Sequence, residues 1–308
     1  MSRYILKRIL LLIPVLLGVA VLIFTIIHMA PGDPAQTMLG ANATQEEIQE
    51  LRVSLGLEKP LYVQFGIFMG NTLRGDLGKS IITNDPVLGE ILLRLPATCT
   101  LAFLGLLFAI LIGVPLGTLA AIKQNSIVDA VCSFIALAAF SIPNFWLALM
   151  LMLLFSVMYP ILPSSGMGTW KHLIIPTVVV GGQFMATIAR MTRSSMLEVI
   201  RQDYIRTARA KGLPYKLVLT RHIFSNVLIP VITIAGLSFG QALGGIVITE
   251  TVFSIPGTGR FLVDAIRAHD YPVVQGGVLF FAAFVGVVNL LVDMLYAFVD
   301  PRIKAQYR

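Results

Sequence analysis

The sequence is short of charged residues. Asp, Glu, Lys and Arg make up 13% of its 308 residues, whereas 56% are apolar and the mean hydropathy is +0.85. Soluble domains carry about 25% charged residues. A chain with so few cannot cover a water-facing surface, which excludes an ordinary soluble enzyme.

Cysteine and histidine are also scarce. The chain has two cysteines, Cys99 and Cys132, and both lie in or beside apolar runs, where cysteine behaves as a small apolar residue. They do not form a disulfide framework. No cluster of Cys and His has the spacing of metal ligands, so we expect no metal site.

Complete nucleotide and hydrolase motifs are missing too. Residues 78–80 match the end of a phosphate-binding loop, but the glycine needed five positions earlier is Leu73. The run GLSFG at 236–240 matches G-x-S-x-G, yet it falls in an apolar helical run instead of a strand-to-helix turn. An intramembrane serine hydrolase using Ser238 remains the alternative from another class, and no histidine is placed to act as its base. We expect no catalytic residue in this chain.

Long uncharged runs are what the chain has in abundance. About 20 apolar helical residues cross the hydrocarbon core of a membrane. Six runs qualify or nearly qualify, at 9–30, 97–122, 130–159, 173–189, 223–249 and 275–299. A secretory signal is the alternative for the first run, but no cleavage site follows it. The pattern predicts an all-α integral membrane protein with six transmembrane helices.

The distribution of Lys and Arg predicts the orientation, because these residues stay on the cytoplasmic side of short loops. With the N-terminus inside, the cytoplasmic segments hold 15 of the 23 basic residues. The short outer loops hold Lys171, Arg260 and Arg267, and the other basic residues lie in the longer loop 31–96. Both termini are therefore expected in the cytoplasm. The net charge of +7 reflects this topology and not a nucleic-acid partner.

The pattern of the long outer loop predicts a small folded cap. Thr44 and Glu47 have the spacing of a capping box, Gly56 stands where the following helix should stop, and Pro60 suits the start of a second helix. Contact with an extracytoplasmic partner and a simple covering lid are both open as its role.

The inner loop 190–222 is strongly basic, with eight Lys and Arg against two acids. Asp203 is expected to cap a short helix over 204–211, and Gly212 is expected to end it. Pro214 then begins the next helix. The sequence predicts helix, glycine turn and helix on the cytoplasmic side.

Two roles are open for this loop. The small residues Ala208 and Ala210 would permit close approach of another protein's surface. Alternatively, the loop is a basic segment attracted to anionic lipid.

Polar residues inside the apolar runs are candidates for a transport pathway, because they are costly in lipid unless they face a partner or water. The candidates are Asn144, Gln183, Thr233, Gln241 and Glu250. Glu250 lies at the outer end of its run, where it can simply reach water.

Several ordered motifs point to one family. The run DYIRTARAKG at 203–212, followed by NVLIP at 226–230, resembles the cytoplasmic EAA loop of ABC importer permeases, in the form of the dipeptide, oligopeptide and nickel branch. Further matches are PGDP at 31–34, LGL at 55–57, KPL at 59–61, GDLG at 75–78, SIPNF at 141–145, ETVFSIPG at 250–257, DYPV at 270–273 and DPR at 300–302. The general pattern has glutamate six residues before the glycine, where this chain has Arg206.

The resemblance implies a type I ABC importer permease (MetI-like) fold in a bacterial inner membrane. It implies a second similar permease, two cytoplasmic ATPase subunits that hold ATP and Mg, and an extracytoplasmic solute-binding protein. This chain would hold no cofactor and would import short peptides, with chelated nickel or another small solute as the alternative. A receptor that signals only through its basic loop is a further alternative.

The resemblance also assigns parts of the chain. Residues 1–30 form the cytoplasmic N-terminus and first span, 31–96 an extracytoplasmic subdomain, 97–300 a five-helix core with coupling loop 190–222, and 301–308 a tail. The coupling positions are Asp203, Tyr204, Arg206, Thr207, Ala208, Arg209, Lys211 and Gly212.

Overall fold

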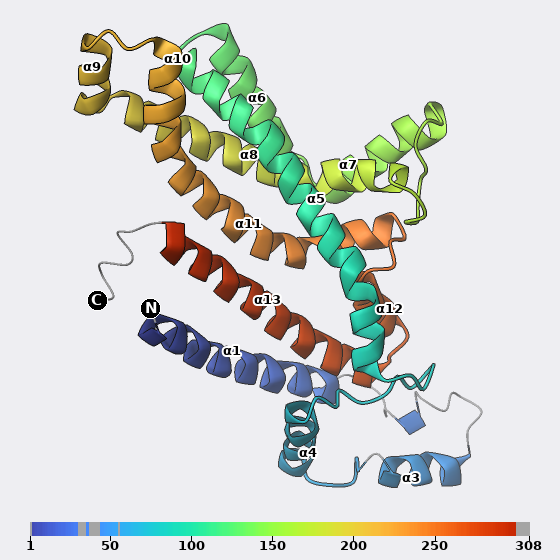
Figure 1. Ribbon diagram of the computed structural model, residues 1–308. Coiled ribbons are helices and arrows are strands. Elements are labelled where there is room, and N and C mark those ends of the chain that lie inside the picture. The colour runs from blue at the N-terminus through green and yellow to red at the C-terminus, as the bar shows by residue number, and fades with distance from the viewer. Residues whose placement is uncertain (1, 30–34, 37–43, 55, 300–308) are drawn as a thin grey trace. The chain divides into compact units, whose positions relative to one another are not determined.

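The computed structural model describes residues 2–29, 35–36, 44–54 and 56–299 (Figure 1). The motifs at 31–34 and 300–302, and Leu55, lie outside the described residues. The regular secondary structure of the described residues is helical, with one isolated β-bridge between Lys79 and Pro86. Contacts divide it into two compact units.

The first unit contains Ala97–Pro256 and the described residues from Leu291 onward. Its elements are the larger part of α5 (Val87–Ile122), α6 (Ile127–Ser141), α7 (Asn144–Met152), a π-helical segment (Leu153–Met158), α8 (Lys171–Ile200), α9 (Asp203–Ala210), α10 (Tyr215–Leu217), a second π-helical segment (Val218–Ile223) and α11 (Phe224–Val252). Helix α9 follows α8 directly, and α10 leads into α11 (Figure 1).

The second unit contains Ser2–Pro96 and Gly257–Leu290. Its elements are α1 (Ser2–Met29), α3 (Gln45–Ser54), α4 (Leu61–Leu73), the start of α5, α12 (Thr258–Arg267) and most of α13 (Tyr271–Val299).

Five helices in the described residues are long and apolar enough to cross a membrane. They contain Arg8–Met29, Val87–Ile122, Lys171–Ile200, Tyr215–Val252 and Tyr271–Met294. The pair α6 and α7 with its π-helical extension makes a sixth span if it is counted as one. The predicted all-α architecture with six spans is confirmed in this form.

The third predicted span, 130–159, is not one straight helix. Helix α6 ends at Ser141, Ile142 and Pro143 are extended, and the chain then bends by 100° into α7. Proline has no N–H to continue the helical hydrogen bonds, and its ring disfavours helical backbone at the residue before it. The apolar run is continuous in composition, but the helix is broken at Pro143, and hydrophobicity alone does not indicate this break.

Several helices extend beyond the predicted apolar runs, and α5 and α8 do so by the most residues. Helix α5 begins at Val87 instead of 97, and α8 ends at Ile200 instead of 189. Glu, Lys and Arg are good helix formers, so a charged residue ends an apolar run without ending the helix.

Helices α5 and α8 pack with their backbones in contact. A Cβ atom on Gly117 would lie 2.3 Å from the carbonyl oxygen of Ala189, and one on Gly181 would lie 2.6 Å from that of Gly105. Small residues permit such close approach of membrane helices. The crossing fixes α8, on which the candidate sites below depend.

The predicted cap in the second unit is confirmed in its local details. The Thr44 N–H donates to Glu47 Oε2 at 2.8 Å and the Glu47 N–H donates to Thr44 Oγ1 at 3.3 Å, as in a capping box. The Thr44 N–H and the Thr44 hydroxyl both donate to the Glu47 carboxylate and thereby lower the pKa of Glu47 from its ordinary value. Gly56 has a φ of +68° after α3, and Pro60 precedes α4.

Candidate functional site

The predicted cytoplasmic helix exists as α9, Asp203–Ala210. It ends at Gly212, whose φ of +76° is the left-handed conformation that glycine adopts most easily. The expected cap by Asp203 is wrong, because Asp203 is the first helical residue and Gln202 precedes it without a capping side chain. Asp203 instead places a carboxylate in the first turn, where the helix dipole favours it.

Helix α9 is seated on the chain's own core by two side chains. Ile205 is 0% exposed and Ala208 is 8% exposed. They pack in one cluster with Met196 of α8 and with Val218 and Ile223, which precede α11. The hydrophobic contacts tie the short helix to both of the long helices that flank it.

Polar contacts also hold α9 in this position. The side-chain amide of Asn226 donates to the Tyr204 hydroxyl at 3.0 Å, and the Arg209 guanidinium lies 5.4 Å from the centre of the Tyr215 ring. These bonds join α9 to the first turns of the next helix. The loop is therefore packed against the long helices that flank it.

The two alanines of α9 lie on different faces. Ala210 is exposed, whereas Ala208 is buried against the chain itself. Ala208 thus permits close packing within the chain, and its predicted part in the contact with another protein stays a prediction. The other predicted coupling positions are exposed, namely Asp203, Tyr204, Arg206, Thr207, Arg209, Lys211 and Gly212.

Three of the five pathway candidates meet in a cavity of about 260 Å³ in the first unit. Asn144 of α7, Gln183 of α8 and Gln241 of α11 line it, and the Asn144 amide donates to Gln183 Oε1 at 3.4 Å. Thr187 also lines it and was missed, although it lies one helical turn from Gln183. The lining mixes polar and apolar residues, and none of the lining residues is charged.

The other two candidates lie elsewhere. The Thr233 hydroxyl donates to the Ile229 carbonyl of its own helix at 2.8 Å, and Thr233 does not line the cavity. Glu250 is 0% exposed and accepts a hydrogen bond from Thr98 of α5 at 2.6 Å. The interpretation that Glu250 reaches water is wrong, because the carboxylate joins α11 to α5.

An ion pair that the sequence reading missed joins α6 to α8. Arg193 Nε and Nη2 donate to the two carboxylate oxygens of Asp129 at 2.7 and 2.8 Å. The Asn125 N–H and the Ser133 hydroxyl complete the environment of Asp129 at 3.0 and 3.3 Å. Bidentate, charge-assisted bonds of this kind are geometrically specific. Nothing in the spacing of two residues 64 positions apart reveals such a pair.

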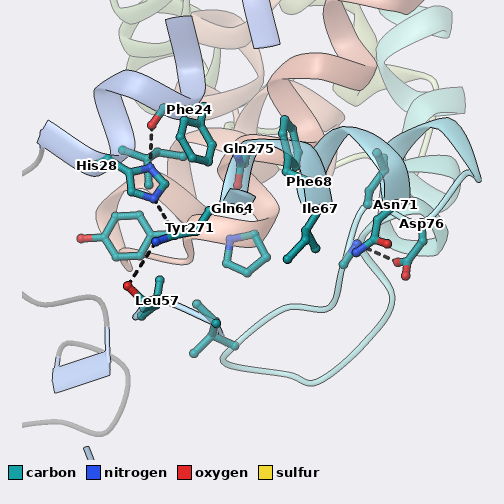
Figure 2. A pocket seen from close by; sticks show the side chains of 16 residues that line it. Phe24, His28, Leu57, Gln64, Ile67, Phe68, Asn71, Asp76, Tyr271 and Gln275 are labelled. Atoms are coloured by element: carbon teal, nitrogen blue, oxygen red, sulfur yellow. Dashed lines mark hydrogen bonds between the residues drawn. The ribbon is translucent and has the colours of Figure 1, made fainter. Parts of the chain in front are cut away.

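The second unit contains a mainly apolar pocket of about 290 Å³ (Figure 2). Phe24 and His28 of α1, Phe68 of α4 and Tyr271 of α13 contribute rings to its wall. One ring nitrogen of His28 lies 2.8 Å from the Phe24 carbonyl and the other lies 3.0 Å from Gln64 Oε1. These contacts fix the His28 ring between α1 and α4.

Comparison with known families decides the identity of the chain. Residues 113–305 match the model of the binding-protein-dependent transport system inner membrane component, and residues 1–102 match its N-terminal component. The chain belongs to this family of permeases. It is a multi-pass inner membrane protein and the permease subunit of an ABC importer.

Curated relatives match this permease over its whole length. It is 46% identical to the dipeptide transport system permease protein DppB of Alkalihalophilus pseudofirmus, covering 99% of this chain and 100% of the relative. It is 44% identical to the glutathione transport system permease protein GsiC of Pectobacterium atrosepticum and 41% identical to DppB of Escherichia coli, in both cases over 99% of each chain.

Solved structures confirm the predicted fold of the permease. The inward-facing MetNI methionine ABC transporter matches with a TM-score of 0.59 at 18% identity, covering 68% of this chain and 96% of that chain. An amino acid ABC transporter with histidines matches with a TM-score of 0.54 at 16% identity, covering 70% and 94%. The type I permease fold is therefore the fold of this chain.

Both matching family models describe membrane components of the transporter. Ser238 is 3% exposed within α11, so the G-x-S-x-G run is part of a helix and not a nucleophile turn. Ser80, from the partial phosphate-loop match, donates its hydroxyl to Asp270 at 2.5 Å and has a structural role. Within the described residues, no group of three or more His, Cys, Asp or Glu side chains could hold a metal ion.

Proposed function

We propose that this permease imports short peptides. The observation that carries the proposal is the match over 99% of the chain to permeases named for dipeptide and glutathione transport, both of which are short peptides. The uncharged cavity lined by Asn144, Gln183 and Gln241 supports it. Side-chain amides donate and accept hydrogen bonds with a peptide backbone, and they carry no charge that would hold a charged solute in place.

The working transporter contains partners in addition to this chain. We infer a second, similar permease, two cytoplasmic ATPase subunits that hold ATP and Mg, and an extracytoplasmic solute-binding protein. Both termini lie in the cytoplasm, 31–96 lies outside and helix α9 lies inside. The excess of Lys and Arg in the inner segments supports this orientation.

Helix α9 couples the permease to its ATPase. Its outward face presents Arg206, Arg209 and Ala210, while Ile205 and Ala208 hold it against α8 and α11. A helix fixed on one side and exposed on the other can transmit the movement of a docked protein to two long helices. ATP can shift the permease between its outward-facing and inward-facing states only if the ATP-bound ATPase binds one of these states more tightly than the other.

Reconstituted transport tests the function. The complete complex is placed in vesicles with ATP, and uptake of a labelled dipeptide is measured with and without the binding protein. We expect uptake that needs both ATP and the binding protein and that excess glutathione or other short peptides reduce. Uptake of a nickel chelate or another small solute without any peptide uptake would contradict the proposal.

Co-purification tests the assembly. We expect a tagged permease to recover both the second permease and the ATPase. Recovery of a folded permease that never binds an ATPase under these conditions would contradict the coupling role of α9.

A further inference from the structure

One face of α8 carries polar side chains along its second half. The face, called here the α8 polar face, consists of Gln183, Thr187, Arg190, Ser194 and Glu198 of the helix and Arg201, which directly follows its last residue. At 3.6 residues per turn these six positions fall within an arc of about 80°. Five of them are exposed and Thr187 is half-buried. The remaining faces of α8 pack on α5, α6 and α11.

Three hollows of the first unit open along this face. The cavity of about 260 Å³ lies at Gln183 and Thr187, and a groove of about 810 Å³ includes Arg190, Ser194 and Glu198. A hollow of about 560 Å³ between α8, α9 and α11 also includes Ser194 and Glu198. The hollows follow one another from the uncharged cavity to the coupling helix.

Gln183 and Thr187 lie in the predicted apolar run 173–189, where polar side chains are costly in lipid. The other four residues of the face belong to the predicted inner loop 190–222, on the aqueous side. The exposed face of α6 shows the contrast, since Val131 and Phe134 are exposed and apolar there and line none of these hollows. The polar face of α8 therefore suits water or a polar solute.

Two arginines of α8 differ in their partners. Arg193 is paired with Asp129. Arg190 lies 4.5 Å from the centre of the Phe140 ring, and among the described residues no carboxylate pairs with it. Phe140 itself lines the uncharged cavity. The ring thus holds an available guanidinium at the boundary between the cavity and the charged groove.

We propose that the α8 polar face lines a water-filled exit path for the solute and that Arg190 attracts the solute's carboxylate along it. A guanidinium binds a carboxylate through two parallel hydrogen bonds. Arg190 lies about 10 Å along the helix from Gln183, which matches about three extended residues. A short peptide in the cavity can therefore reach it. The identity of the solute rests on the proposed function, whereas the water-filled path does not.

Thiol labelling of the complete complex in nanodiscs tests the path. Cys99 and Cys132 are replaced by Ala, Ser194→Cys is introduced, and the rates of reaction with a small anionic and a small cationic methanethiosulfonate are compared without ATP. We expect both reagents to react, with the anionic reagent favoured. Arg190→Gln should lower the ratio of anionic to cationic rates about fivefold, because the charge is one helical turn away.

Matched variants separate this reading from others. Arg190→Lys should preserve the rate ratio, and Lys123→Gln, which removes an exposed charge elsewhere in the first unit, should leave it unchanged. Phe134→Cys, on the apolar face of α6, should react much more slowly than Ser194→Cys. An unreactive Ser194→Cys, equal reaction at both cysteines, or a ratio that Arg190→Gln does not change would overturn the proposal.

Uptake tests the role of Arg190 in transport. In vesicles with the full complex, we expect Arg190→Gln to lower the maximal rate of dipeptide uptake about tenfold, and Arg190→Lys to retain at least half of it. Full activity of Arg190→Gln would overturn the role of Arg190. Failure of the wild type to import any peptide would contradict the proposed function alone, since the labelling needs no solute.

Discussion

Helices α1 and α8 are both long enough to cross a membrane, but they serve different purposes. In the most apolar part of α1, 17% of the residues are buried within the chain, against 56% in α8. Helix α8 is the less hydrophobic of the two, yet it carries the close packing with α5, the ion pair to Asp129 and the polar face. Among the five candidate spans, the most hydrophobic one therefore has the smallest buried share, because hydrophobicity measures compatibility with lipid and not packing.

Glycine substitutions test this comparison most severely. A side chain on Gly117 of α5 meets the Ala189 backbone of α8, whereas one on Gly18 of α1 meets nothing within 4 Å. Overpacking costs about 1–3 kcal/mol and more where backbone must move. We expect Gly117→Val to abolish the folded permease in detergent, measured by size-exclusion chromatography and thermal melting. Gly18→Val is the control and should behave as wild type, and equal behaviour of the two variants would contradict the comparison.

Breaking the ion pair is expected to have the next largest effect. Asp129→Ala leaves Arg193 without its partner, and removing one member of a fully buried pair costs about 3–5 kcal/mol. The Arg193 side chain is 32% exposed, so we expect about 2–3 kcal/mol here. Thermal melting of the single variants and of Asp129→Ala with Arg193→Ala measures the coupling. Additive losses in the double variant would show that the two residues do not interact.

Substitutions in α9 test how its packing against α8 holds the coupling helix in place. Ala208→Glu places a carboxylate against Ile205 and Met196, and an unpaired buried polar group costs about 1–3 kcal/mol. We expect faster proteolysis of 201–214 and loss of solute-stimulated ATP hydrolysis. Ala210→Glu, on the exposed face, should leave proteolysis unchanged and reduce uptake severalfold. Equal protease sensitivity of the two variants would show that Ala208 does not contribute to the packing of α9 against α8.

The glycine after α9 should give the smallest change in stability. A side chain at Gly212 meets nothing within 4 Å, so the cost of Gly212→Val is the strain of a φ of +76°, about 1–2 kcal/mol. We expect normal membrane insertion with strongly reduced uptake, because the angle between α9 and the next helix changes. Gly212→Asn tolerates the left-handed conformation and should retain most uptake. Full uptake by Gly212→Val would show that coupling does not depend on the conformation of this turn.

The local features of this permease could be read from the sequence because their causes are local. The capping box at Thr44 and Glu47, the stop at Gly212 and the apolar runs depend on neighbouring residues, and the structure bears them out. The break at Pro143 was available in the sequence as well, but the apolar run around it concealed the bend. The ordered motifs identified the family, which the family models confirmed.

The sequence alone determined that this chain is a helical membrane protein with a basic, helical loop that ends at a glycine, because composition and short-range spacing set these properties. Only the tertiary structure decided which face each residue occupies. It buried Ala208, joined Glu250 to Thr98, paired Asp129 with Arg193 and gave Arg190 no carboxylate partner within the part of the chain that the structure describes. The reason is physical, since these contacts join residues far apart in the chain, and their geometry exists only after the helices have packed.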